Sequence, residues 1–154
     1  MGLITLELFA TLDLVAQSPG SPEEDPENFP FGGWQAPLLD QVSGAQVAAA
    51  YEGTDALLLG RRTYDIFAAY WPHQHDSFAT LFNTIPKYVA SRGTPDLLWN
   101  GSTQLGPDLA GAVREIRDRH DNIKVVGSLD LVQTLLREKL FDRLDLWVHP
   151  ILLG

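Results

Sequence analysis

Two apolar runs that end in glycine, each followed directly by a helical pattern, restrict the folds open to this chain. Residues 56–60 read ALLLG and residues 123–127 read IKVVG. Short apolar runs closed by glycine are typical of strands buried on both faces of a sheet. Helical patterns start at Arg61 and Ser128, immediately after these runs. Strands that alternate with helices predict an α/β fold with a mostly parallel central sheet and helices on both faces.

The other segments fit the same alternation. Residues 18–33 are rich in proline, glycine and acidic side chains, which predicts a long loop. Apolar periodicity assigns the remaining elements. The expected strands are 3–9, 85–91, 97–99 and 142–153, and the further expected helices are 37–51, 77–83 and 108–120.

Three junctions follow the predicted parallel strands, where ligands bind in such sheets. Each junction alone has an ordinary structural explanation. The first is explained as a tight turn with solvated arginines, the second as a plain loop, and the third as a helix start capped by serine. Together they favour an extended polyphosphate ligand, because helix N-termini and arginine side chains both attract phosphate. The junction residues are Gly60, Arg61, Arg62 and Thr63, then Ser91 and Arg92, then Gly127, Ser128 and Leu129.

Charge is distributed unevenly along the chain. The sequence has 20 acidic and 11 basic residues, a net charge of −9, and no basic residue precedes Arg61. We expect no binding to nucleic acid or to anionic membranes, because both require a basic surface. The absence of cysteine excludes disulfides, thiolate zinc sites and cysteine nucleophiles. Without a membrane-length apolar run or a basic leader, we expect a cytoplasmic protein.

Two carboxylates in the acidic part are candidate catalytic groups. A carboxyl group buried beside an aromatic ring can serve as a proton donor. Asp40 follows Trp34 at the start of a predicted helix, and Asp13 follows the first strand. Both positions also suit purely structural roles, since aspartate is common in helix first turns and in loops.

Metal binding and hydrolysis have weaker support. The stretch 73–76 (HQHD) has metal-ligand residue types, but Pro72 places it in a loop and no further histidine is near, so we expect no metal. Ser128 lacks the context of a nucleophile elbow.

Seven segments of the chain resemble the dihydrofolate-reductase-like family. The branch they resemble includes the C-terminal reductase domain of the bifunctional riboflavin-biosynthesis deaminase/reductase, and the resemblance covers nearly the whole chain. The segments are TLDLVAQ (11–17), GGW (32–34), LLGRRTY (58–64), AYWP (69–72), NTIPKYVASR (83–92), VVGS (125–128) and HPILLG (149–154).

The resemblance implies a three-layer reductase fold with NADPH as cofactor. It places residues 60–63 at the cofactor's phosphates and Ser91 with Arg92 at the adenosine 2′-phosphate. Gly127, Ser128 and Leu129 would lie beside the pyrophosphate and the nicotinamide. On the substrate side, it implies catalytic roles for Asp13 and Asp40, and substrate contacts from Trp34 and Tyr64.

The chain departs from the family pattern at two places. Leu14 stands where the family has glycine after the aspartate, and the chain stops at Gly154, where the family forms a last hairpin. We therefore expect a single domain over 1–154 without that hairpin. Either the sequence is truncated there or a sheet edge is left bare, and a bare edge favours pairing into a homodimer. The expected C-terminal strand is antiparallel.

The expected function is NADPH-dependent hydride transfer to a small pterin-like or pyrimidine-like heterocycle. The alternative is a non-catalytic nucleotide-binding or interaction module on the same fold.

Overall fold

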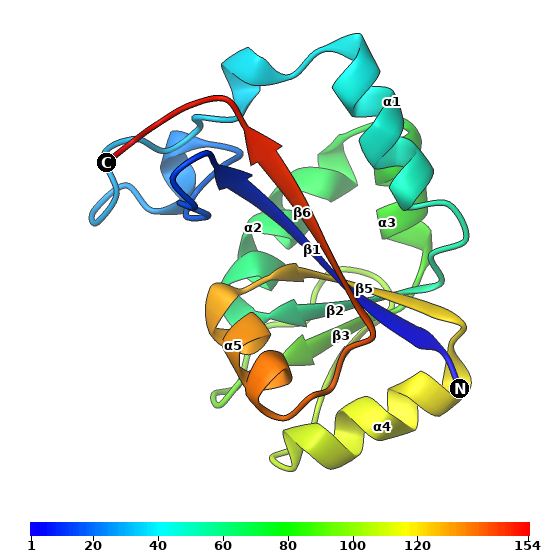
Figure 1. Cartoon of the computed structure of the whole chain (residues 1–154). Coiled ribbons are helices and arrows are strands. Elements are labelled where there is room, and N and C mark those ends of the chain that lie inside the picture. The colour runs from blue at the N-terminus through cyan, green and yellow to red at the C-terminus, as the bar shows by residue number, and fades with distance from the viewer. The chain divides into compact units, whose positions relative to one another are not determined.

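One sheet of six parallel strands organises the structure, a computed structural model that describes residues 1–154 (Figure 1). The strand order is β4-β3-β2-β5-β1-β6. The strands are β1 (Leu3–Thr11), β2 (Ala56–Gly60), β3 (Lys87–Ala90), β4 (Ser102–Gln104), β5 (Asn122–Gly127) and β6 (Arg143–His149). The helices are α1 (Gln41–Ala50), α2 (Arg61–Tyr70), α3 (Ser77–Thr84), α4 (Leu109–Arg119) and α5 (Leu129–Arg137), with 3₁₀ turns at Pro22–Glu24, Ala36–Leu38 and Trp71–His73. The predicted α/β fold is confirmed, and no helix is long and apolar enough to span a membrane.

The chain divides into two compact units. The larger unit comprises Met1–Leu6 and Gly53–Leu144, and the smaller one comprises Glu7–Glu52 and Asp145–Gly154. A single domain over the whole chain stays a prediction.

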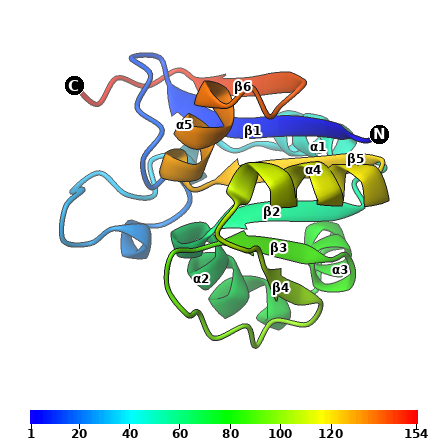
Figure 2. The ribbon, with the colours of Figure 1, turned by 90° about the horizontal axis from the view of Figure 1, so that it is seen from below.

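The larger unit has β2 at its centre. All five residues of β2 are buried, as the apolar run predicts. Helices α2 and α5 both pack on β2, and Figures 1 and 2 show α4 and α5 together on one side of the strands. Parallel register aligns Gly60 with Ala90 and Leu59 with Gly127, so β2, β3 and β5 end at the same edge of the sheet.

Side-chain caps start two helices of this unit, α4 and α5, where the sequence predicts them. Asp108 accepts a hydrogen bond from the Gly111 N–H at 3.0 Å and begins α4, and Ser128 accepts one from the Leu131 N–H at 3.3 Å and begins α5. These contacts satisfy N–H groups that a helix start leaves unpaired.

The fourth strand lies later in the chain than predicted. Residues 97–99 form no strand, and β4 instead follows the Asn100–Gly101 turn. The Trp99 side chain is buried against the ring of Tyr64 and the Nζ atom of Lys87, 4.4 Å from its ring centre. Within 97–99, Trp99 is buried by tertiary packing while Leu98 is 91% exposed, so the apolar run does not mark a strand.

The start of α1 also differs from the prediction. The helix begins at Gln41, while Pro37 lies in a separate 3₁₀ turn. Asp40 is the N-cap, and the α1 side chains are half-buried or exposed, with none fully buried.

The prediction of an antiparallel C-terminal strand was wrong, because β6 runs parallel to β1, its neighbour in the sheet (Figure 1). Helix α5 is a crossover that returns the chain to the edge where the strands begin. There the Asp142 N–H donates to the Ile4 carbonyl at 2.9 Å, and the Ile4 N–H donates to the Asp142 carboxylate at 2.8 Å. The next strand must therefore run in the same direction as β1.

Candidate functional site

Two of the predicted junctions interlock through their glycines. A Cβ atom on Gly60 would lie 2.7 Å from the backbone nitrogen of Ser128, and one on Gly127 would lie 2.5 Å from the Thr63 Oγ1 atom. Real Cβ atoms do not approach this closely. The start of α2 and the start of α5 are therefore in direct contact, and this contact requires both glycines.

The two helix starts differ in capping. Gly60 is the N-cap of α2 and supplies no side-chain cap, whereas Ser128 caps α5. The first N–H groups of α2 are thus left for a ligand, and the helix dipole gives that position a positive potential. Arg61 and Arg62 are exposed in the same turn, and no acidic residue occupies it. This environment favours an anion.

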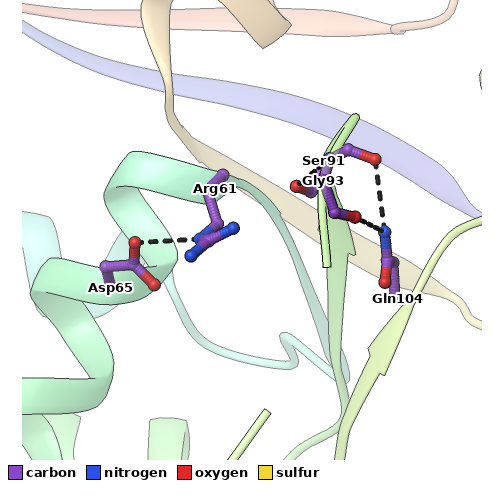
Figure 3. A network of polar contacts seen from close by, with 5 residues as sticks. All are labelled: Arg61, Asp65, Ser91, Gly93 and Gln104. Carbon is purple, nitrogen blue, oxygen red and sulfur yellow. Dashed lines mark hydrogen bonds and ion pairs between the residues drawn. The ribbon is translucent and has the colours of Figure 1, made fainter. Parts of the chain in front are cut away.

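The second junction meets the first at a tight turn after β3. A Cβ atom on Gly93 would lie 3.7 Å from the Nη1 atom of Arg61 and 3.9 Å from the hydroxyl oxygen of Ser91. The Arg61 Nε atom donates to Asp65 at 3.0 Å, which holds the guanidinium in place (Figure 3). The Gly93 N–H donates to the Ser91 hydroxyl oxygen at 3.1 Å. A guanidinium and a hydroxyl therefore border the open space beside Gly93.

Arg92 extends from this turn toward the third junction. Its Nη2 atom lies 3.9 Å from the Asp130 carboxylate in the first turn of α5. Because the Arg92 side chain is 96% exposed, this pair contributes little to stability. All three junctions thus meet at the carboxyl edge of β2, β3 and β5, and the exposed Leu129 begins α5 beside them.

Tyr64 does not face this edge. Its side chain is 1% exposed, and its hydroxyl donates to the Ser102 hydroxyl at 3.0 Å. The Tyr64 hydroxyl also accepts the Trp99 backbone N–H at 3.3 Å. It joins α2 to the segment around β4, and its predicted substrate contact stays a prediction.

In the smaller unit, Asp13 is held as an ionised turn residue. The Thr11 hydroxyl donates to it at 2.6 Å, and the backbone N–H groups of Leu153 and Gly154 donate at 3.3 and 2.9 Å. These hydrogen bonds, led by that from Thr11, lower the pKa of Asp13.

Asp40 has the surroundings of a helix cap. Its carboxylate accepts the Ser43 N–H at 2.7 Å, and the Ser43 hydroxyl accepts the Asp40 N–H at 3.0 Å. The bonds with Ser43 lower the pKa of Asp40. A proton donor needs the opposite shift, so neither Asp13 nor Asp40 has the environment of a general acid.

Trp34 lies in the smaller unit and is almost fully buried. Its indole N–H donates to the Gln17 carbonyl at 2.9 Å, and its ring meets that of His149 edge to face at 5.3 Å. Its predicted substrate contact stays a prediction.

In the larger unit, Asp76 of the 73–76 stretch caps α3 by accepting the Ala79 N–H at 2.8 Å.

Sequence reasoning missed Gly93, Asp65 and Gln104 at the site. A glycine two residues after Ser91 is a detectable turn signal. The spacing of Arg61 and Asp65 is that of an ion pair on a helix. Gln104 gave no signal, because its place follows only from the pairing of β4 with β3.

In the smaller unit, sequence reasoning also missed the buried Glu7 as a candidate functional residue. Its carboxylate accepts the Trp147 indole N–H at 2.8 Å. Burial, together with the charges of Glu7 and Asp145, raises the pKa of Tyr51. Glu7 lies in an apolar strand pattern, where a single acidic residue reads as one exposed position.

Comparisons with known proteins agree on one fold. The structure resembles a riboflavin biosynthesis protein from Shewanella sp. PV-4 (TM-score 0.65, 18% identity, 97% of this chain and 78% of that one). It also resembles RibD from Acinetobacter baumannii, with a TM-score of 0.61 and 14% identity. The match covers 100% of this chain and 48% of that one, so this chain spans about half the length of that protein. A third neighbour is dihydrofolate reductase from Enterococcus faecalis, solved in complex with NADP(H). Its TM-score is 0.59 at 12% identity, and the match covers 99% of this chain and 74% of that one. At these identities the likeness shows the fold.

The sequence comparison is more specific. No curated protein sequence matches the chain. The family model described as the RibD C-terminal domain matches residues 3–154, which is almost the entire length. The resemblance stated above is thereby confirmed, and the chain belongs to the RibD C-terminal domain family.

Proposed function

We propose that this protein is an NADPH-dependent reductase that transfers hydride to a small pterin-like or pyrimidine-like heterocycle. Membership of the RibD C-terminal domain family points to a reductase of the riboflavin or folate type. The observation that carries the proposal is the meeting of three junctions at one sheet edge, with an arginine and a serine hydroxyl around an open glycine.

The turn at Gly93 fits the 2′-phosphate that distinguishes NADPH from NADH. The space beside its Cα atom is bordered by Arg61 and Ser91. The Nε atom of Arg61 is occupied by Asp65, which leaves the terminal nitrogens as donors. The Ser91 oxygen accepts the Gly93 N–H and keeps its own proton to donate. These donors match the oxygens of a phosphomonoester.

The interlocked helix starts fit the pyrophosphate. The first N–H groups of α2 have no side-chain cap, and the Thr63 hydroxyl in the same turn lies against Gly127. A polyphosphate lying over the two helix starts would be held by main-chain donors and would extend along the edge to the Gly93 turn. Ser128 and Leu129 would line its other side.

When bound, the nicotinamide supplies the hydride. The chain's part is to orient the ring and the substrate and to steer protons. Because Asp13 and Asp40 both have lowered pKa values, they act in this proposal as ionised acceptors that orient a substrate N–H or a water molecule, and not as acids. Trp34 is the proposed aromatic contact for the substrate.

The rival is a binding module that has the cofactor site without the chemistry. Leu14, in place of the family glycine, favours this rival. The two proposals differ in turnover, which stopped-flow absorbance at the nicotinamide band measures with a panel of pterins and pyrimidines. Oxidation with at least one member supports the reductase, and tight NADPH binding with no oxidation by any member supports the module.

Asp40→Asn tests the steering role, since asparagine caps helices as well as aspartate does. We expect at least a tenfold loss of turnover with unchanged NADPH affinity. Ser43→Ala is the matched control, because it removes the cap's partner and leaves the Asp40 carboxylate in place. Unchanged turnover in Asp40→Asn would show that Asp40 is only a cap.

A further inference from the structure

The turn after β3 is held by one side chain from the neighbouring strand. The Gln104 amide nitrogen donates to the Gly93 carbonyl at 2.7 Å and to the Ser91 carbonyl at 3.3 Å. Figure 3 shows Gln104 on one side of the turn and Arg61 on the other. Two carbonyl groups of a three-residue turn are therefore fixed by a single amide.

This arrangement places the hydrogen-bond acceptors and the donors of the turn on different sides. The carbonyl oxygens of Ser91 and Gly93 are engaged by Gln104. The Ser91 hydroxyl and the open side of Gly93 face Arg61. Carbonyl oxygens repel an anion, whereas hydroxyl and guanidinium groups attract one. Gln104 thus holds the acceptors of the turn away from the face that carries the donors.

Strand pairing explains why Gln104 reaches the turn. β4 pairs with β3 in parallel, and Gln104 lies opposite Val89, two residues before Ser91. The Leu105 N–H then donates to the Val89 carbonyl at 2.9 Å, which fixes the backbone immediately after Gln104. The half-buried glutamine side chain is therefore aimed along the strand toward the turn.

We propose that Gln104 is a positioning residue that sets the preference for a 2′-phosphate over a 2′-hydroxyl. It acts through the Ser91–Gly93 turn and does not itself touch the phosphate. The inference rests on the proposed function, because it assumes that the 2′-phosphate of NADPH binds at this turn.

The test compares dissociation constants for NADPH, NADH, adenosine 2′,5′-bisphosphate and AMP. Gln104→Met keeps the length of the side chain and removes the donor. We expect it to weaken NADPH and the bisphosphate roughly tenfold, the effect of losing about one net hydrogen bond, and to change NADH and AMP less than twofold. Gln104→Glu, which replaces the donor with a charged acceptor, should weaken the phosphorylated pair further. Thr103→Ala, an exposed change on the same strand, should alter none of the four constants.

The outcomes separate this inference from the proposed function. A wild-type protein that binds NADH as tightly as NADPH overturns both. A wild-type preference for NADPH that Gln104→Met and Gln104→Glu leave intact overturns only the role of Gln104. An equal loss for all four ligands, with an unchanged melting temperature, would mean that Gln104 shapes the site without setting the preference, and this also overturns the inference.

Discussion

Leu14 shows how one side chain can depart from a family pattern while the backbone keeps it. Its φ angle is +64°, in the left-handed region that favours glycine. The turn is closed by the Leu14 N–H donating to the Thr11 carbonyl at 2.9 Å, and the leucine side chain is 68% exposed. The backbone that a glycine would adopt is therefore retained, at a cost in strain, and this weakens the case for a non-catalytic module.

Leu14→Gly should stabilise the protein. Relief of the left-handed strain, on the order of 1–2 kcal/mol, exceeds the extra entropy of glycine in the unfolded chain, roughly 0.5–1 kcal/mol. Leu12→Gly is the matched control, because Leu12 is similarly exposed (60%) and has no positive φ angle. Urea unfolding should show Leu14→Gly above the wild type and Leu12→Gly below it. A loss of stability in Leu14→Gly would argue against a strained turn.

The contact between the starts of α2 and α5 is the element-level feature that builds the site. It brings Thr63 against Gly127 and Ser128 against Gly60, so that two helix N-termini lie together at the proposed anion site. A side chain at either glycine would separate the helices. The glycines are therefore required for packing.

A double-mutant cycle tests this contact. Gly127→Ala alone should destabilise the protein by about 1–3 kcal/mol, because the new methyl group meets the Thr63 hydroxyl. In a Thr63→Ala background the same change should cost clearly less, since the opposing oxygen is gone. The two costs are compared by urea unfolding of the four proteins. Additive costs would show that the two residues do not meet.

The elements that the sequence predicted are those whose signal is local. The apolar run of β2 and the capping residues Asp108 and Ser128 needed no knowledge of the rest of the chain. The position of β4 was predicted wrongly because Trp99 packs against Tyr64 and Lys87, which is a tertiary contact and not a sign of a strand. The direction of β6 depends on the crossover through α5 and on no residue within β6. Similarly, Arg61 and Ser91 could be predicted as site residues, whereas Gln104 depends on strand register.

Charge in the molecule follows the division into two units. The smaller unit holds nine of the 20 acidic residues and none of the 11 basic ones, so it carries the whole net charge of −9. The larger unit is neutral and contains every arginine of the proposed phosphate site. The net charge of −9 is therefore compatible with the proposed anionic cofactor, because the cations lie in the unit that supplies the ends of β2, β3 and β5.

Lys87 in the larger unit makes the free energy of unfolding depend on pH in the alkaline range. Its side chain is fully buried, its Nζ atom donates to the Asn100 carbonyl at 2.8 Å, and burial lowers its pKa to about 8. Between pH 8 and 9.5 the unfolded lysine remains charged while the folded one loses its proton. The unfolded state then binds more protons, so the free energy of unfolding should rise with pH, on the order of 1.5 kcal/mol over this window.

Lys87→Met removes the titrating group and keeps the volume of the side chain. Its free energy of unfolding, measured by urea denaturation, should therefore lack the rise between pH 8 and 9.5. The wild type and Lys124→Met, which replaces a lysine on β5, should both show it. The same alkaline rise in Lys87→Met would assign the effect to another group.

The proposed cofactor site is tested by equilibrium titration of tryptophan fluorescence with NADPH and NADH, in the wild type and in Gly93→Ala. An alanine methyl at position 93 would make only ordinary contacts, 3.7 Å to Arg61 and 3.9 Å to Ser91, so the fold should tolerate it. It would, however, fill the space assigned to the 2′-phosphate. We predict that the wild type binds NADPH at least tenfold more tightly than NADH, a preference typical of charge-assisted phosphate contacts, and that Gly93→Ala abolishes this preference. Equal affinity of the wild type for the two dinucleotides, or binding of neither, would contradict the account.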